Sequence, residues 1–185
     1  FVVWPFLLSH FFTARFWQGD QDLENWTGRV IVYRDEDKKI PMYRGTLEDG
    51  VLQGLGEEYS EDGLLIYKGS FADGVRSGNG SCYKDGVLIY EGEFNGGLYE
   101  GMGSLFEDGT LCYRGSFVSG LREGDGTAYY PGGQRAYTGT FAEGHYEGEG
   151  TEYWESGQVR YRGSFTQGRY DGSGTFYLED GDQLR

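Results

Sequence analysis

Cysteine, histidine and proline are scarce in this sequence. Its 185 residues include two cysteines, two histidines and three prolines. Cys82 and Cys112 form no CxxC motif and have no histidine near them, so we expect no metal site. Two part-buried thiols and a single disulfide between neighbouring repeats both fit these positions. The redox compartment therefore stays open.

Positive charge is also scarce. Sixteen Lys and Arg side chains stand against 30 Asp and Glu, which gives a formal net charge of −14. Binding to nucleic acid through its phosphates needs clustered Lys and Arg, and the sequence contains no such cluster. The same acidity disfavours binding to anionic lipid headgroups. We therefore expect a soluble chain without a nucleic-acid partner.

Glycine and aromatic residues, by contrast, are abundant. The chain has 34 Gly, and 17% of its residues are aromatic, mostly Tyr and Phe. Disordered segments are poor in aromatic residues because they have too little apolar surface to bury. Glycine and aromatic residues at regular spacing instead predict repetitive β structure.

The spacing is that of a tandem repeat. Each copy begins with Tyr-x-Gly, and the copies start at residues 43, 67, 90, 113, 137 and 161. An apolar residue stands four places after each tyrosine, a glycine seven places after it, and a Gly-x-Gly begins eleven places after it. A further aromatic residue and a Gly-containing turn close each copy. Six copies with this many fixed positions identify a repeat architecture.

Side-chain alternation explains the pattern. In Tyr-x-Gly-x-Phe, the first, third and fifth side chains share one face of a strand. The next glycine allows a turn with positive φ, and Gly-x-Gly belongs to a second strand whose glycines leave room for rings of adjacent strands. Turns such as Asp62-Gly63 and Asp85-Gly86 suit tight hairpins. The sequence therefore predicts an all-β fold, an elongated array of antiparallel β-hairpins.

These residues resemble the MORN repeat, whose pattern runs Tyr-x-Gly-x-aromatic-x-x-Gly-x-x-x-Gly-x-Gly. Residues 113–126 (Tyr-Arg-Gly-Ser-Phe-Val-Ser-Gly-Leu-Arg-Glu-Gly-Asp-Gly) fit every fixed position. The family often has Trp where this chain has Phe in five copies and Leu47 in the first. The resemblance implies a twisted β ribbon that serves as a protein–protein scaffold. Lipid binding has also been proposed for the family, and the acidity of this chain disfavours it.

The array has a degenerate beginning. Gly28–Tyr33 has the spacing of a second strand, with Val30 in place of the second glycine. We therefore expect a half-repeat over residues 27–42 and place the whole array at residues 27–185. The array reaches the C-terminus without an evident polar cap, as a truncated or continued array would. Because the chain begins with Phe1 rather than Met, we expect it to be part of a longer protein or a processed product.

Residues 1–26 differ from the array. Residues 1–17 are apolar apart from a narrow polar stripe and one arginine. Pro5 suits the first turn of a helix, and Gly19 suits the position after its end. We therefore predict a short N-terminal apolar helix, followed by a polar connector over residues 18–26.

Three roles for residues 1–17 stay open. They are a cap on the first hairpins, the end of a transmembrane helix that starts upstream, and a segment that docks on another molecule. Aromatic residues near the end of the segment suit a membrane interface. The side chains of the predicted membrane or partner anchor are Trp4, Phe6, Leu7, Leu8, Phe11, Phe12, Phe16 and Trp17.

No pattern in the array is typical of catalysis. Ser70, Ser116 and Ser164 recur at one place of the repeat, which indicates strand residues rather than nucleophiles. His145 stands at a variable turn position, and acid–base work by the Asp and Glu residues would need a pocket that separates their pKa values. Gly-x-Gly here lacks the strand–helix context of a phosphate loop. We therefore expect a non-enzymatic protein without a cofactor.

These features favour a scaffold that binds a protein partner along its aromatic face. Tyr and Phe anchors give large contact area at low entropy cost, and the acidity favours a basic or amphipathic partner segment. The predicted partner-binding residues are Tyr67, Phe71, Tyr90, Phe94, Tyr113, Phe117, Tyr137, Phe141, Tyr161 and Phe165. The alternative for each of these rings is internal packing.

The alternative function is a membrane-tethered accessory module of a larger membrane complex, anchored through residues 1–17. The sequence leaves the location of the protein open between the cytoplasm and a membrane surface.

Overall fold

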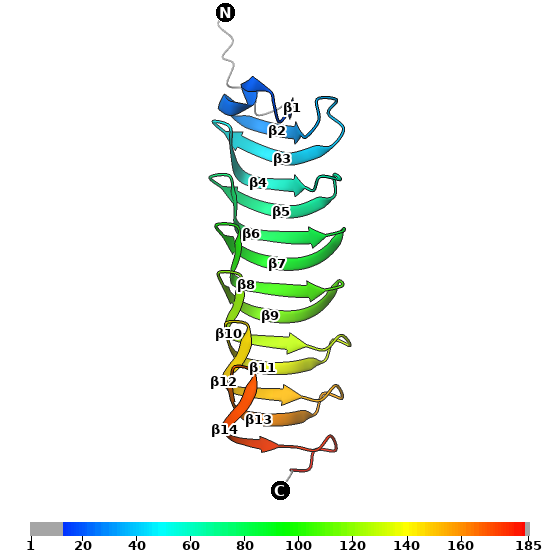
Figure 1. The fold of residues 1–185 in the computed structure, drawn as a ribbon, viewed down its shortest axis with the longest axis vertical. Helices are drawn as coiled ribbons and strands as arrows, with labels where there is room; N and C mark the ends of the chain where they lie inside the picture. Colours follow the sequence, from blue (N-terminus) through cyan, green and yellow to red (C-terminus); the bar gives the residue numbers. More distant parts are fainter. Residues whose placement is uncertain (1–12, 184–185) are drawn as a thin grey trace, which may run out of the picture. The chain divides into compact units, whose positions relative to one another are not determined.

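The computed structural model describes residues 13–183, and these residues are all-β, as the sequence predicts (Figure 1). They form a 14-stranded sheet in which the strands are ordered as in the chain, and their helical content is the short 3-10 helix η2 (Gln21–Asn25). The chain divides into two compact units. Unit 1 runs to Leu88 and includes Phe94–Gly97, and unit 2 consists of Ile89–Glu93 and the residues from Leu98 onward.

Antiparallel hairpins make up each unit. The strands of unit 1 are β1 (Ala14–Trp17), β2 (Gly28–Tyr33), β3 (Pro41–Glu48), β4 (Val51–Tyr59), β5 (Leu65–Ala72) and β6 (Val75–Lys84). Residues of β7 (Val87–Asn95) belong to both units. The strands of unit 2 are β8 (Leu98–Glu107), β9 (Thr110–Val118), β10 (Leu121–Tyr129), β11 (Arg135–Ala142), β12 (His145–Tyr153), β13 (Val159–Thr166) and β14 (Arg169–Phe176).

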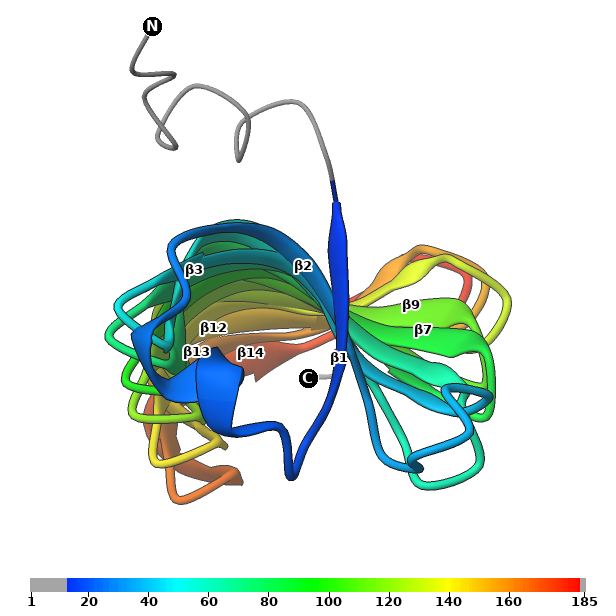
Figure 2. The same cartoon turned by 90° about the horizontal axis from the view of Figure 1, so that it is seen from above.

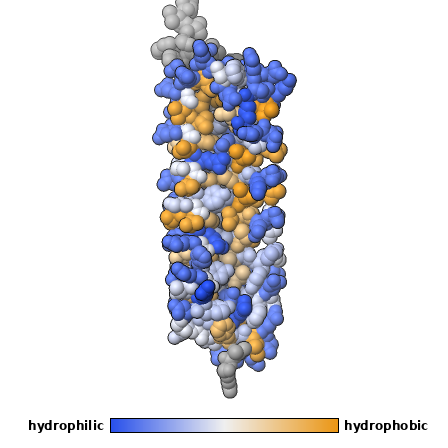
Figure 3. All heavy atoms as spheres, in the orientation of Figure 1, coloured by the Kyte–Doolittle hydropathy of each residue, from blue (hydrophilic) through white to orange (hydrophobic). Residues whose placement is uncertain are grey.

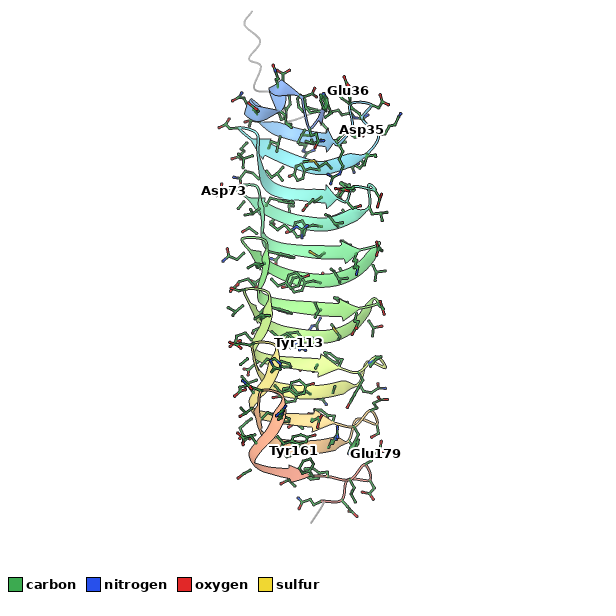
Figure 4. All side chains as sticks on the ribbon, viewed as in Figure 1. Asp35, Glu36, Asp73, Tyr113, Tyr161 and Glu179 are labelled. Carbon is green, nitrogen blue, oxygen red and sulfur yellow. The ribbon has the colours of Figure 1, made fainter. Side chains whose placement is uncertain are left out.

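The turn inside each repeat explains why a glycine stands seven places after each opening tyrosine. Between β5 and β6, Asp73 has φ +49° and Gly74 has φ +80° (Asp73 is labelled in Figure 4). Two successive residues with positive φ define the tight hairpin turn whose twist matches that of the strands. Aspartate tolerates this region better than most residues, and glycine adopts it without steric cost.

The first glycine of Gly-x-Gly produces a β-bulge. In unit 2, Gly124 has φ +70°, and the register between β9 and β10 shifts between Arg122 and Gly126. Three residues of β10, 123–125, thus face the single residue Ser116 of β9, and extra residues in one strand bend it and increase its twist. The second glycine, Gly126, pairs directly with Gly115 across the hairpin. The two glycines therefore differ in function: one provides the bulge and the other lies beneath a ring.

Successive repeats are also joined at their turns. The N–H of Gly120 donates to the carbonyl of Tyr99 in the preceding repeat, 2.9 Å away. In unit 1 the N–H of Gly74 donates to Leu52 in the same way, at 3.0 Å. Each such bond satisfies a backbone donor that the turn itself leaves unpaired, so the turns stabilise the stacking of repeats.

The N-terminal part differs from the prediction. Residues 14–17 form strand β1, which pairs in parallel with β2, so the predicted helix is wrong for these residues (Figure 2). Without β1, the edge of β2 would carry unpaired backbone groups over its apolar residues 30–33, and a strand satisfies these groups whereas a helix cannot. Phe16 also packs edge-on against Trp26, with ring centroids 5.1 Å apart. Residues 1–12, where the rest of the helix was predicted, lie outside the described residues.

Trp26 shows how the array begins without a complete first repeat. Its carbonyl accepts a hydrogen bond from the N–H of Gly50 at 3.0 Å, as Leu52 does for the next turn. Gly28–Tyr33 forms β2 and pairs antiparallel with β3. Helix η2 lies just before Trp26, where a complete repeat would have its hairpin turn.

Candidate interaction surface

One face of the strands, called here the inner face, carries the tyrosine that opens each repeat and the phenylalanine four places later. These rings are buried, with 0 to 5% of their surface exposed. Two of them, Tyr113 and Tyr161 of unit 2, are labelled in Figure 4. The buried set includes all ten predicted partner-binding residues: Tyr67, Phe71, Tyr90, Phe94, Tyr113, Phe117, Tyr137, Phe141, Tyr161 and Phe165.

The rings contact one another from repeat to repeat. Tyr137 packs edge-on against Phe141 of its own repeat (5.3 Å, 89°) and against Phe165 of the next repeat (5.1 Å, 88°). In unit 1, Tyr67 packs in the same way against Phe71 and Phe94, each with centroids 5.1 Å away. Edge-to-face pairs at this distance add about 0.5–1.5 kcal/mol each to the burial of the rings. The aromatic residues therefore form the core of each unit.

The tyrosine hydroxyls are satisfied within the repeat. Tyr113 donates to the carbonyl of Ser116 at 3.0 Å, and Tyr137 donates to Thr140 at 3.1 Å. Burial raises the pKa of both phenols to about 12. The structure thus gives these rings the internal packing role that the sequence left as an alternative. A direct contact between them and a partner remains a prediction.

A different set of side chains lies over the buried rings on the inner face. In unit 2, Tyr99 stacks on Tyr90 (3.7 Å, 5°), and Tyr146 stacks on Tyr137 (3.8 Å, 6°). The guanidinium of Arg122 lies 5.5 Å from the ring centre of Tyr113. Each of these covering residues stands nine places after the tyrosine that opens its repeat, and each is half-buried. We call these residues the inner row.

The inner row can be recognised in the sequence by the restricted residue types at its repeat position. The position nine places after each tyrosine holds only Leu, Arg or Tyr in the six repeats, namely Leu52, Arg76, Tyr99, Arg122, Tyr146 and Tyr170. Arginine and tyrosine both present a flat group that can stack on a ring. A position that varies only among flat or apolar side chains predicts that the residue covers a ring.

A scan against protein-family models matches the MORN repeat six times, at residues 43–64, 67–87, 90–111, 113–135, 137–159 and 161–183. The chain belongs to the MORN-repeat family. Each match begins at the opening tyrosine of a repeat, so the resemblance drawn from the sequence is confirmed. A search of curated proteins found no match. MORN repeats are non-catalytic modules that generally interact with proteins or membranes.

The inner face of the first MORN repeats contains a groove. Within unit 1 it has a volume of about 520 Å³ and is bordered by Met42, Leu52 and Phe71 together with two arginines, Arg34 and Arg76. The guanidinium of Arg76 forms an ion pair with Glu58 at 2.8 Å and lies 4.8 Å from the ring centre of Tyr67. Arg34 donates to the carbonyl of Tyr59 at 2.8 Å. The groove therefore combines apolar walls with an arginine whose charge is balanced by Glu58 and with Arg34, which is held by a backbone carbonyl.

The predicted anchor residues are described only in part. Phe16 packs against Trp26, and the indole of Trp17 lies over the backbone of Gly19. Trp4, Phe6, Leu7, Leu8, Phe11 and Phe12 lie outside the described residues. Within residues 13–183, no helix has the length and apolar character needed to cross a bilayer. Anchoring through residues 1–17 remains a prediction.

The cysteines and acidic side chains form no recognisable metal centre in the described part. Cys82 and Cys112 are free thiols, and burial raises the pKa of each. Among residues 13–183, no three His, Cys, Asp or Glu side chains are grouped in a way that could hold a metal ion. His145 is exposed, and its Nδ1 lies 3.1 Å from the carbonyl of Glu143.

Proposed function

We propose that this MORN array is a non-enzymatic scaffold that binds a segment of a partner protein along its inner face. The observation that supports this most is the inner row. Tyr99, Arg122 and Tyr146 each rest on a buried ring and are themselves half-buried, so a partner can reach them. The buried rings beneath them would hold these side chains in place when a partner binds.

Side chains of these types suit recognition. Tyrosine and arginine are enriched among residues that contribute most to protein–protein binding. Stacking on the core already restricts the rotamers of Tyr146 and Arg122, so less side-chain entropy would be lost on binding.

Charge and the unit 1 groove indicate the kind of partner. The net charge of −14 favours a segment that carries Lys or Arg. Met42 and Leu52 offer apolar contacts to such a segment. A basic amphipathic peptide satisfies both requirements, and recognition of such peptides through apolar anchors is a recurring binding mode.

A displayed library of random peptides, selected on the 185-residue chain, tests this proposal. The informative variant is Tyr146→Arg, because Arg122 already occupies the same repeat position over Tyr113 and the fold therefore accommodates it. The matched control is Thr151→Arg, in the same strand β12 but with its side chain on the opposite face.

We expect selection to enrich basic peptides with apolar residues. Their affinity should fall at least tenfold for Tyr146→Arg and stay unchanged for Thr151→Arg. Chemical denaturation should show that both variants stay folded. Thr151→Arg should keep the unfolding free energy of the wild type within about 0.5 kcal/mol, and Tyr146→Arg should lose about 0.5–1.5 kcal/mol because its ring contacts are replaced by those of an arginine. Equal binding of the selected peptides to wild type and Tyr146→Arg would contradict an inner-face site.

A further inference from the structure

We propose that unit 2 has a second docking surface, on the face opposite the inner one, that binds a basic amphipathic helix of a partner protein. This outer face carries four exposed aliphatic side chains from three consecutive strands, β8, β9 and β10. We call them the aliphatic patch. Their exposed fractions are 51% for Leu98, 57% for Met102, 49% for Val118 and 52% for Leu121.

Backbone pairing brings the four residues together. Leu121 pairs with Val118 across the hairpin turn, and Met102 pairs with Ser116 two residues before Val118. The hydrogen bond from the N–H of Gly120 to the carbonyl of Tyr99 places this turn beside the start of β8, next to Leu98. Isolated exposed apolar residues are common, whereas adjacent ones mark interaction sites. Apolar residues are visible among polar ones on the molecular surface in Figure 3.

Folding of the repeat does not require aliphatic side chains at these places. Later hairpins of the same unit have His145 and Arg169 where the earlier ones have Leu98 and Leu121. Their strands β12 and β14 pair with their neighbours in the usual way. Asp125 and Glu149 likewise replace Met102 in the two repeats that follow it. The aliphatic patch therefore has no role in hairpin formation that would account for its exposure.

The spacing of the patch fits an α-helix laid across the strands. Leu98 and Leu121 belong to strands two apart in the sheet, and strands lie about 4.7–4.9 Å apart. Equivalent residues are therefore separated by roughly 9.6 Å. Residues seven apart on a helix are separated by about 10.5 Å and share one side of it. An extended peptide fits less well, because side chains on one of its faces recur every 6.6 Å or so.

A polyproline segment has a suitable repeat of about 9.3 Å, since every third residue faces the same way at a rise of 3.1 Å. Such segments dock in grooves lined by aromatic rings. The patch consists of aliphatic side chains and a methionine, which suit the apolar side of a helix. The helix is therefore the occupant that this surface fits.

Charge around the patch determines the polar side of that helix. The strand positions that alternate with the inner face in residues 89–93 and 98–126 carry five carboxylates, those of Glu91, Glu93, Glu100, Glu123 and Asp125. The same positions carry one basic side chain, Arg114, which donates to Ser104 at 3.2 Å. A helix with Lys or Arg beside its apolar stripe would meet this surface with complementary charge.

Synthetic peptides test the proposal directly. The probe is a 21-residue peptide of Leu, Ala and Lys, with Leu at heptad spacing along one side and Lys beside it. One control peptide has the same composition in scrambled order, and a second is a Pro- and Lys-rich peptide of equal length. Binding to the 185-residue chain is measured by fluorescence anisotropy, and helix formation by circular dichroism.

Three protein variants locate the site. Leu98→Glu and Leu121→Glu alter the patch at exposed positions, and Leu178→Glu makes the same change at a leucine of unit 2 that is 43% exposed and lies in a different part of the chain. We expect the heptad peptide to gain helicity on binding, and each patch variant to weaken it at least tenfold while Leu178→Glu leaves it unchanged.

Other outcomes would overturn the proposal. These are equal binding of the heptad and scrambled peptides, tighter binding of the proline-rich peptide, and binding that is indifferent to Leu98→Glu and Leu121→Glu. Loss of the same binding in Tyr146→Arg would place the peptide on the inner face and count against the outer one. The two docking surfaces can therefore fail independently.

Discussion

The ring of Tyr113 lies against the backbone of Gly126 on the adjacent strand β10. A methyl group at Gly126 would come within 2.5 Å of Cε2 and 2.6 Å of Cζ of that ring, far inside van der Waals contact. Gly115 is equally confined, since a methyl group there would lie 2.6 Å from the carbonyl oxygen of Asp125. The tyrosine and the two glycines therefore pack as one unit, in which the ring fills the space that side chains at Gly115 and Gly126 would occupy.

Gly126→Ala should destabilise the fold because the added methyl group displaces the ring of Tyr113. Overpacking of this kind costs about 1–3 kcal/mol of unfolding free energy. Chemical denaturation of the variant measures the cost. The matched control is Asp125→Ala, the preceding residue, whose side chain is exposed on the outer face and whose replacement should change the unfolding free energy by less than about 0.5 kcal/mol.

A double-mutant cycle separates a clash with the ring from a general loss of glycine. In the Tyr113→Leu background, the Gly126→Ala exchange should cost clearly less than in the wild type, because the ring is no longer there. An identical cost in both backgrounds would show that the ring does not restrict this position.

The sequence predicted the all-β class and the repeats because each element of the pattern has a local cause. The alternation of Tyr, Gly and Phe depends only on strand geometry, and the Asp73-Gly74 turn depends only on positive φ. The burial of Tyr113 was harder to predict. A periodic ring can face a partner or a core, and only the packing of Phe141 from the next repeat decides between them.

Strand β1 was missed for a related reason. Its four residues contain no strong strand pattern. Their conformation follows from pairing with the edge of β2, more than ten residues along the chain. A tertiary requirement of this kind overrides local propensity. The aliphatic patch was visible in the sequence as Leu98 and Leu121, but its exposure became clear only once the inner face was assigned.

Alkaline pH should unfold the array through its buried phenols. Burial raises the pKa of Tyr43, Tyr67, Tyr113 and Tyr137 to about 12, against about 10 for tyrosine in an unfolded chain. Below pH 10 these groups are neutral in both states, so their contribution to stability is complete. Above it the unfolded state binds fewer protons, and stability falls as the pH rises towards 12.

Phenolate absorbance and circular dichroism, followed together against pH, check this expectation. The ionisation of the buried phenols should coincide with loss of β structure between about pH 10 and 12. Tyr113→Phe removes one such group, so the fall in unfolding free energy over this range should be less steep in that variant. Complete ionisation of all tyrosines near pH 10 with the fold intact would contradict the burial of these hydroxyls.

Glu123 joins two repeats at their turn edge, and its replacement should loosen the second of them. Its Oε2 accepts a hydrogen bond at 3.0 Å from the N–H of Glu143, which has φ +50° in the following hairpin turn. Glu100 makes the same contact with the N–H of Ser119 one repeat earlier. Glu123→Ala removes the acceptor and should lower the unfolding free energy by about 0.5–1.5 kcal/mol, while Glu123→Gln keeps an oxygen acceptor and should lower it less.

Hydrogen exchange of the Glu143 amide reports the contact directly. The exchange should accelerate in Glu123→Ala, whereas exchange of the Ser119 amide should not change. Unaltered protection of Glu143 in that variant would show that the backbone bond from Gly144 to Arg122, at 3.0 Å, is enough to hold the turn.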